Sequence, residues 1–525
     1  MKRKGLVAVG MAATLILAMT GCGKNSTDTA GQSGSSAEGQ EAESTKETAD
    51  ADNGENANGD YTKIVYSYWT MDRIPDEASR QSVEEAINEI TREKIGVEVE
   101  LMPLEASEQA QKVSLAMASG EQLDIFNTVG DLNTYIANNQ VYDITDLVHE
   151  HAQGAVDQVS EEFLKTTMND GKIYAIPADK GIALAANLYY RKDIAEELNL
   201  DMASVSQIED LTPIYEKVAQ TYPEMSALAG GAGGLELIHT LKDFEVDYLT
   251  DSWAKPLGAV LMGDSMTVEN LYATEEFKGR VELMRDWYQK GYILKDSATT
   301  TASCQETVAA GKAFSFIGNQ AGNYGVQEAS SMCGYEMGYI RLSQPYLDTT
   351  SVNTVTWAIS SQCKNPEKAL EFLNLTYTDP DVVNLIVFGL EGRDYVKVSD
   401  REMVFPEGLD ANTVPYTAQF SCGVVGSQFK QLVHEGTPED NNDLMYKENH
   451  ESKISPAFGF TFDSTPVKAE YTAVTNVIDQ YLPGLVWGSI EPDTELPKFL
   501  TALQEAGMDD IIAAKQEQLD AWAAQ

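Results

Sequence analysis

Residues 171–194 read GKIYAIPADKGIALAANLYYRKDI, and the rest of the chain is organised around this stretch. Ile173 and Ala175 alternate along a short predicted strand, which ends at Pro177. A run of small residues follows, and an apolar strand resumes near Tyr189 and leads into a helix start. Such a segment either carries the chain from one lobe to another or joins two strands of one sheet. Clefts between lobes commonly bind small ligands, so the first alternative predicts a binding site here.

The N-terminus has the pattern of a secretory signal. Residues 1–4 form a positively charged region, residues 5–19 are uncharged and apolar, and Thr20-Gly21-Cys22 is a small-residue cleavage site. The apolar run is short for a transmembrane helix. The site resembles the lipobox of bacterial lipoproteins, with Met19 where that family usually has leucine. This resemblance implies a signal peptide over residues 1–21 and lipid such as palmitate on Cys22; an uncleaved signal anchor is the alternative.

The segment after this cysteine has no means of forming a core. Residues 23–60 contain no aromatic or large aliphatic side chain, so we expect a disordered tether between the lipid and a folded body. The net charge of −45 would repel phosphate backbones and anionic headgroups. We therefore expect no nucleic-acid partner, and membrane contact only through the lipid.

Four further cysteines are widely and irregularly spaced, and they match no zinc pattern. We expect free buried thiols, although an extracellular location permits a disulfide among them. They are Cys304, Cys333, Cys363 and Cys422.

The folded body is predicted to be an α/β protein. Strand patterns at residues 63–68, 97–101 and 123–129 alternate with helical patterns, of which the clearest spans residues 79–94. Alternation of this kind predicts mainly parallel sheets flanked by helices. A chain of 525 residues is also too long for one compact core, so two or more domains are expected.

A second crossing between lobes is predicted at residues 308–325, where a strand ends in a glycine-rich loop. Helix starts are predicted where a polar capping residue precedes proline, at Asn365-Pro366 and Asp379-Pro380. A later helix is predicted to open at Thr465-Pro466 and to end at Pro483-Gly484.

No catalytic signature is present: the sequence has no HExxH, no GxSxG and no P-loop. His149 and His151 form the one close histidine pair, and their spacing places them on opposite flanks of a helix. We expect no metal site, no cofactor and no enzyme activity.

Several stretches in this order resemble the extracellular solute-binding proteins of bacterial ABC importers, the maltose-type family. They are DGKIYAIP at 170–177, LYYRKDI at 188–194, AAGKAFSFIG at 309–318 and ISSQCKNPEKALEFLNLTYTDP at 359–380. The C-terminal part resembles the domain of unknown function that ends LipO-like lipoproteins. Its matching stretches are LIVFGLEGRDY at 385–395, SPAFGFTFD at 455–463 and AGMDDIIAAKQEQLDAW at 506–522.

The resemblance implies a periplasmic-binding-protein-like fold of type II, in which two α/β lobes close over a ligand. The implied layout places a first lobe at 61–185, a second at 186–319, a return to the first at 320–360, and the second lobe with a helical C-terminal domain at 361–525. The implied function is capture of a small solute, most simply a carbohydrate or oligosaccharide, for delivery to a permease. The protein would act as a lipid-anchored monomer on the outer face of the cell membrane. A surface enzyme or sensor acting on polysaccharide is the alternative.

Candidate ligand contacts follow from the chemistry of sugars rather than from a family motif. Aromatic rings stack on the apolar faces of sugars, while amides and charged groups bond to their hydroxyls. The side chains of these types expected near the cleft are Tyr68, Trp69, Asn127, Asp131, Lys180, Trp253, Asn319, Gln320 and Trp357.

Overall fold

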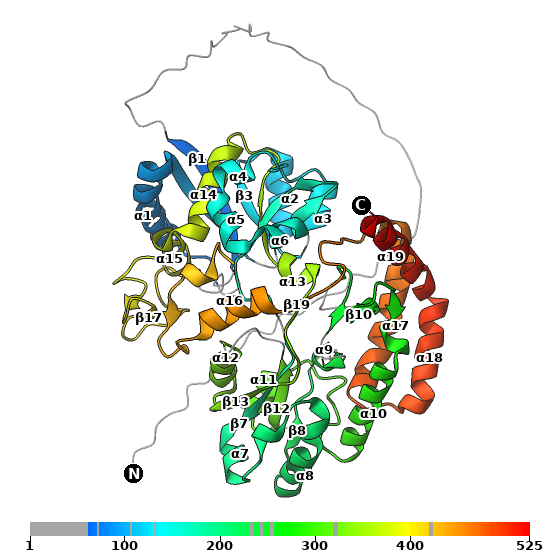
Figure 1. Ribbon diagram of the computed structural model, residues 1–525. Coiled ribbons are helices and arrows are strands. Elements are labelled where there is room, and N and C mark those ends of the chain that lie inside the picture. The colour runs from blue at the N-terminus through cyan, green and yellow to red at the C-terminus, as the bar shows by residue number, and fades with distance from the viewer. Residues whose placement is uncertain are drawn as a thin grey trace, which may run out of the picture. The chain divides into compact units, whose positions relative to one another are not determined.

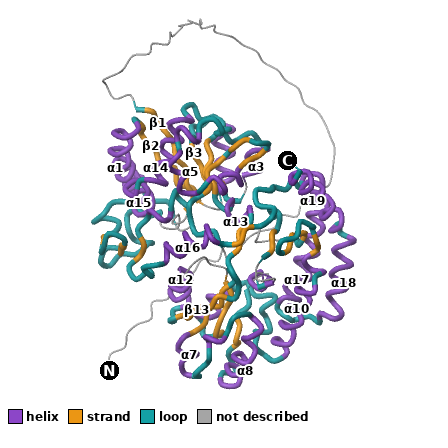
Figure 2. Tube along the Cα trace, in the orientation of Figure 1, coloured by secondary structure: helices purple, strands orange, loops and turns teal. Residues whose placement is uncertain are grey.

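The computed structural model shows one compact unit over Asp60–Gln525, which contains two main sheets (Figure 1). Helices surround both sheets (Figure 2). The structure describes residues 61–524 with gaps at 71–72, 106–107, 131, 184, 232–234, 239, 242–244, 252–256, 319–323 and 419–423.

The first sheet has five strands in the order β2-β1-β3-β15-β6. Four of them share one direction, and β15 runs against its neighbours β3 and β6. Their bounds are Val97–Glu105 for β2, Thr62–Thr70 for β1, Ile125–Thr128 for β3, Thr356–Ile359 for β15 and Ala175–Pro177 for β6.

The second sheet has four strands in the order β13-β7-β12-β8, and only β7 is reversed. The chain passes from β6 of the first sheet to β7 of the second, and no helix is found among the described residues between them. The predicted α/β fold is thus confirmed. One strand is reversed in each sheet, so the sheets are mixed, with two parallel pairs in the first and one in the second. The bounds are Met337–Arg341 for β13, Asn187–Arg191 for β7, Ala313–Gly318 for β12 and Ser226–Leu228 for β8.

Helix ends follow local chemistry. The helix α1, Glu77–Ile95, begins where the Asp76 carboxylate accepts a hydrogen bond from the Ser79 N–H, at 3.0 Å. It ends at Gly96, which adopts a left-handed conformation with φ of 68°. The predicted helix at residues 79–94 therefore extends slightly further at both ends.

The first sheet is buried on both faces, and successive side chains divide between two hydrophobic clusters. Trp357 and Ile359 of β15 pack with α1 and with helices later in the chain. Ala358, between them, faces the opposite cluster. The helices that contribute to these clusters include α2 (Gln109–Ser119), α3 (Leu132–Ala137), α5 (Gln153–Val159), α14 (Pro366–Thr378) and α15 (Pro380–Phe388).

The helices α14 and α15 correct the predicted layout. Ala369, Leu373 and Val383 lie in the same cluster as the first sheet, so this part of residues 361–525 does not share the core of the second sheet. The Asp379 side chain caps α15 as predicted, accepting from the N–H groups of Asp381 and Val382. The sequence predicted the apolar faces of these helices, but it did not predict which sheet they cover.

The C-terminal helices share the core of the second sheet. They are α17 (Lys468–Val486), α18 (Pro492–Glu505) and α19 (Met508–Ala523), and they contact one another and α10 (Glu275–Gln289). The predicted end of α17 at Pro483-Gly484 is wrong, because the helix continues to Val486. Leu485, Val486 and the following Trp487 are buried, and this burial favours the last turn despite the proline.

The second predicted crossing at residues 308–325 is also in a different place. The strand β12 is followed by α12 (Tyr324–Cys333) and then by β13, which belongs to the same sheet as β12. The chain returns to the first sheet only after β13, through residues 342–355. The strand before the glycine-rich stretch and the strand after it therefore belong to the same sheet.

Three of the cysteines, Cys304, Cys333 and Cys363, are free and buried, as expected. Cys22 and Cys422 lie outside the described residues. Within the described part of the chain, no helix has both the length and the apolar character needed to span a membrane.

Candidate functional site

Two crossings connect the two sheets, each running from an edge strand of one sheet to an inner strand of the other. The first, residues 178–186, runs from the end of β6 to the start of β7. The second, residues 342–355, runs from β13 through β14 (Tyr346–Leu347) and α13 (Thr349–Asn353) to β15. Ligands of open α/β sheets bind beyond the carboxyl ends of the strands, which is where the first crossing leaves β6. Residues 171–194 thus carry the chain between two sheets, and the alternative of one sheet is wrong.

The two crossings are bonded to each other at Ala186. Its N–H donates to the Ser343 hydroxyl at 2.8 Å, and its carbonyl accepts from the Leu342 N–H at 2.8 Å. Further along the second crossing, β14 pairs with β19 (Lys453–Ile454) of the C-terminal part. The connection between the sheets is therefore a bonded structure rather than two independent loops.

A distant segment holds Asp179 in the first crossing. The Ser427 hydroxyl donates to the Asp179 carboxylate at 2.5 Å. The Asp179 N–H donates to the Gly426 carbonyl at 3.0 Å, and the Gln428 N–H donates to the Asp179 carbonyl at 2.7 Å. These bonds fix the backbone of the crossing on both sides of the carboxylate.

Asn449 holds the residues that follow. It lies on α16 (Asn441–Glu451), and its side-chain oxygen accepts from the N–H groups of Ile182 at 2.9 Å and Ala183 at 3.2 Å. Its amide nitrogen donates to the Lys180 carbonyl at 2.5 Å. One amide therefore satisfies three backbone groups that belong to no sheet.

Burial changes the acidity of both charged groups in the first crossing. It raises the pKa of Asp179 to about 6, although the Ser427 hydroxyl opposes this shift. It lowers the pKa of Lys180 to about 8. Lys180 is half-buried, and among the described residues no carboxylate pairs with its ammonium group. A poorly hydrated ammonium group without a partner is well suited to bond a ligand oxygen.

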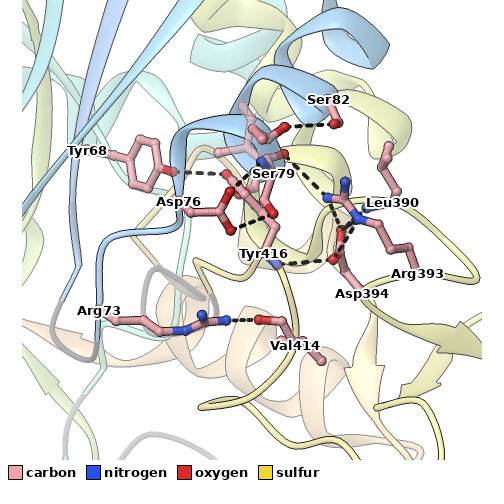
Figure 3. Close-up of polar contacts among 12 residues, drawn as sticks. Tyr68, Arg73, Asp76, Ser79, Ser82, Leu390, Arg393, Asp394, Val414 and Tyr416 are labelled. Carbon is pink, nitrogen blue, oxygen red and sulfur yellow. Dashed lines mark hydrogen bonds and ion pairs between the residues drawn. The ribbon is translucent and has the colours of Figure 1, made fainter.

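Tyr68 and Trp357 lie in the core. Both are fully buried. The Tyr68 hydroxyl lies 2.9 Å from the Tyr416 hydroxyl, beside a group of contacts that also joins Arg73 to the Val414 carbonyl (Figure 3). The Trp357 ring stacks on another aromatic ring inside the first sheet's core. Neither aromatic ring has a face open to a ligand in this structure.

Asn127 and Trp69 lie near the carboxyl edge of the first sheet. Asn127 is fully buried, and the Gln109 amide donates to its side-chain oxygen and to its carbonyl, each at 2.7 Å. Trp69 is half-buried and packs against the core of the first sheet. Of the candidate contacts that the structure describes, only Lys180 and Trp69 keep exposed surface.

The other candidate contacts lie outside the described residues: Asp131, Trp253, Asn319 and Gln320. Their role stays a prediction. Among the described residues, no group of three or more His, Cys, Asp or Glu side chains could hold a metal ion.

No pattern in the sequence points to the residues that hold the first crossing. Ser427 and Asn449 lie 248 and 269 positions from their partners Asp179 and Lys180. Single hydroxyl and amide side chains in polar segments are common, and no local pattern links them to a strand so far away.

Comparisons with known proteins agree with this architecture. The family model described as bacterial extracellular solute-binding protein matches residues 85–387. A domain of unknown function, DUF3502, matches residues 456–524, which include the three C-terminal helices.

Three relatives cover most of the chain. A carbohydrate ABC transporter substrate-binding protein of Streptococcus pneumoniae is 26% identical over 82% of this chain and 86% of its own length. The crystal structure of NgtS, the N-glycan transport solute-binding protein of the same species, has a TM-score of 0.74 at 23% identity, covering 87% of this chain and 98% of that one. It has also been solved with Man1GlcNAc and Man5GlcNAc. An HMO-binding solute-binding protein of Bifidobacterium longum infantis has a TM-score of 0.62 at 16% identity, covering 88% of this chain and 99% of that one.

Proposed function

Because the chain belongs to the bacterial extracellular solute-binding proteins, we propose that it captures a carbohydrate between its two sheets and delivers it to the permease of an ABC importer. Members of this family bind solutes rather than convert them, so the alternative of a polysaccharide-acting enzyme is set aside. The observation that carries the proposal is the pair of bonded crossings between two sheets, because a ligand contacting both sheets can bring them together.

The carbohydrate class is supported by the relatives. The S. pneumoniae protein that aligns with most of the chain is a carbohydrate substrate-binding protein, and NgtS has been solved with two glycans. The candidate site offers matching chemistry, since Lys180 supplies an unpaired donor and Trp69 an aromatic ring at the sheet edge.

The division into two lobes is part of the proposal. The first lobe would be built on the sheet that contains β1, and the second on the sheet that contains β7, with the hinge in residues 178–186 and 342–355. The protein would work as a monomer, because each chain carries both sheets of the site.

The ligand and the role of Lys180 can be tested together. A thermal-shift screen of N-glycan fragments, maltooligosaccharides and fructooligosaccharides should find a class that raises the melting temperature, because ligand binds only the folded state. Lys180→Met should then weaken binding about 10- to 100-fold, as expected for a hydrogen bond from a charged group. Calorimetric titration measures this change, and Lys447→Met on the exposed surface of α16 is the control.

The pH dependence gives an independent check. The Lys180 ammonium loses its proton as pH rises through about 8, so affinity should fall above that pH, by up to about tenfold per unit. Lys180→Met should lack this dependence. If no saccharide stabilises the parent protein, the carbohydrate class is wrong. If a saccharide binds and the Lys180 variant binds equally well, only the role of Lys180 is wrong.

We also propose that lipid on Cys22 anchors the protein, on the evidence of the Thr20-Gly21-Cys22 cleavage pattern. Residues 23–60 would then act as the tether. Cys22→Ala should abolish incorporation of labelled palmitate in the producing cells and release the protein from the membrane fraction. Persistent labelling of this variant would show that the anchor is elsewhere.

A further inference from the structure

A cavity of about 800 Å³ lies among α15, the start of α16 and a small sheet. The small sheet consists of β16 (Val396–Lys397), β17 (Glu402–Val404) and β18 (Val433–His434). None of the described residues that line the cavity belongs to either crossing or to the two main sheets. Its volume is within the range of small-molecule sites, roughly 300 to 1,000 Å³.

Tyr395 offers a hydrogen-bond donor without a partner at this cavity. It lines the cavity while only 5% of its surface is exposed, and its ring lies 6.0 Å from the Phe388 ring. Its hydroxyl makes no hydrogen bond within the described part of the chain and keeps exposed surface, so it is available to a ligand in the cavity. Burial raises the pKa of Tyr395 to about 12, so the hydroxyl keeps its proton at neutral pH.

Gln431 is a fixed part of the same wall. Its amide nitrogen donates to the Val425 carbonyl at 2.9 Å, which fixes the orientation of the side chain. Its oxygen Oε1 is then buried without a partner among the described residues, and the residue is 6% exposed. Because this oxygen has no exposed surface, Gln431 shapes the wall of the cavity and is not itself a ligand contact.

The charges around the cavity have both signs. Five carboxylates and three cationic side chains line it, and an ion pair joins Lys397 to Glu391 at 3.7 Å. A small cation would face Lys430, and a small anion would face acids such as Asp400 and Asp443. Mixed donors and acceptors with the Tyr395 and Phe429 rings suit a neutral ligand rich in hydroxyl groups.

We propose that this cavity is a second saccharide-binding site, which takes a neutral sugar unit outside the space between the two main sheets. This proposal depends only on the residues that line the cavity, so it does not require the proposed capture site to be correct. It would allow the protein to hold a branch or a second molecule of glycan while the capture site is occupied.

Two variants test this site directly. Tyr395→Phe removes only the hydroxyl, and Asn442→Trp fills the cavity from the half-buried face of α16. The probes are mannose, N-acetylglucosamine, glucose and galactose, titrated by ligand-observed NMR into the mature chain. At least one should bind the parent protein. Tyr395→Phe should weaken the affinity for that sugar about 3- to 10-fold, as expected for the loss of one hydrogen bond, and Asn442→Trp should abolish its binding.

Lys180→Met separates this site from the capture site. The monosaccharide binding that Asn442→Trp abolishes should be unchanged in Lys180→Met. Circular dichroism and melting temperature confirm that each variant is folded. The proposal is wrong if none of the four sugars binds, if binding survives in Asn442→Trp, or if Lys180→Met alone abolishes it. Preference for glucuronate or glucosamine over all neutral sugars would also overturn it, since it would mean that the site selects charge.

Discussion

Replacing Lys515 with methionine should lower the free energy of unfolding by about 3 to 5 kcal/mol, the cost of breaking a buried ion pair. Lys515 lies on α19, its side chain is fully buried, and its ammonium nitrogen is 2.8 Å from the Asp251 carboxylate. The same nitrogen donates to the carbonyls of Tyr248 at 3.0 Å and Ala259 at 2.9 Å. Methionine keeps the apolar stem but leaves Asp251 charged, buried and without its cation.

The segment that Lys515 holds is itself strained. Leu249 and Thr250 have φ angles of 52° and 67°, in the left-handed region that side chains with a Cβ disfavour. Such conformations cost about 1 to 3 kcal/mol each and persist only when surrounding contacts fix them. The Tyr471 hydroxyl adds a further contact, donating to the Asp251 carboxylate at 2.6 Å.

Urea denaturation followed by circular dichroism measures the effect of Lys515→Met. The double variant with Asp251→Asn removes both charges, so it should recover part of the lost stability. Lys447→Met, on the exposed surface, should change the free energy of unfolding by less than about 0.5 kcal/mol. A single Lys515 variant as stable as this control would show that the ion pair is not important for folding.

Trp357→Ala should also cost about 3 to 5 kcal/mol, because it empties a packed site in the core. The Trp357 ring is fully buried and stacks on Tyr66, with centroids 4.7 Å apart and an interplanar angle of 12°. Its indole N–H donates to the Val424 carbonyl at 2.6 Å. A residue in this position stabilises the first sheet and has no surface with which to stack on a sugar.

Trp357→Phe provides the matched control, since it keeps an aromatic ring and loses the hydrogen bond. It should lose less stability than the alanine variant, about 1 to 3 kcal/mol. Saccharide titration at a temperature where each variant is folded completes the test. A variant that folds with near-parental stability but loses saccharide affinity would mean that Trp357 contacts the ligand after all.

The sequence predicted the crossing at residues 171–194 because its evidence is local: two short apolar strands on either side of small residues. The sequence could not distinguish aromatic residues of the hydrophobic core from aromatic residues that contact a ligand. Tyr68 and Trp357 occur near strand ends, and the same pattern suits a sugar platform or a buried ring. Only the partners Tyr416 and Tyr66, brought in by the tertiary fold, decide between them.

The same limit explains the error in the predicted layout. The helices α14 and α15 both begin with proline and have apolar faces, and Asp379 caps α15; these are local properties, although Asn365 makes no capping hydrogen bond to α14. Which sheet they cover depends on how the chain returns through residues 342–355, and the sequence placed that return too early at 308–325. The sequence singled out Lys180 as a candidate ligand contact, and that role stays a prediction. It did not point to Ser427 and Asn449, which hold the crossing through Asp179 and the Lys180 carbonyl.

The position of β15 in the first sheet has a kinetic consequence. It lies between β3 and β6, and the hydroxyl groups of Thr128 and Thr356 meet at 2.7 Å although 228 positions separate them. Pairing across so long a stretch of chain must overcome a large loop-closure entropy, which slows folding. The sheet cannot be completed before residue 359 is available, so the early strands lack a central neighbour during synthesis. A nascent chain delayed in this way stays without its complete first sheet for most of its synthesis.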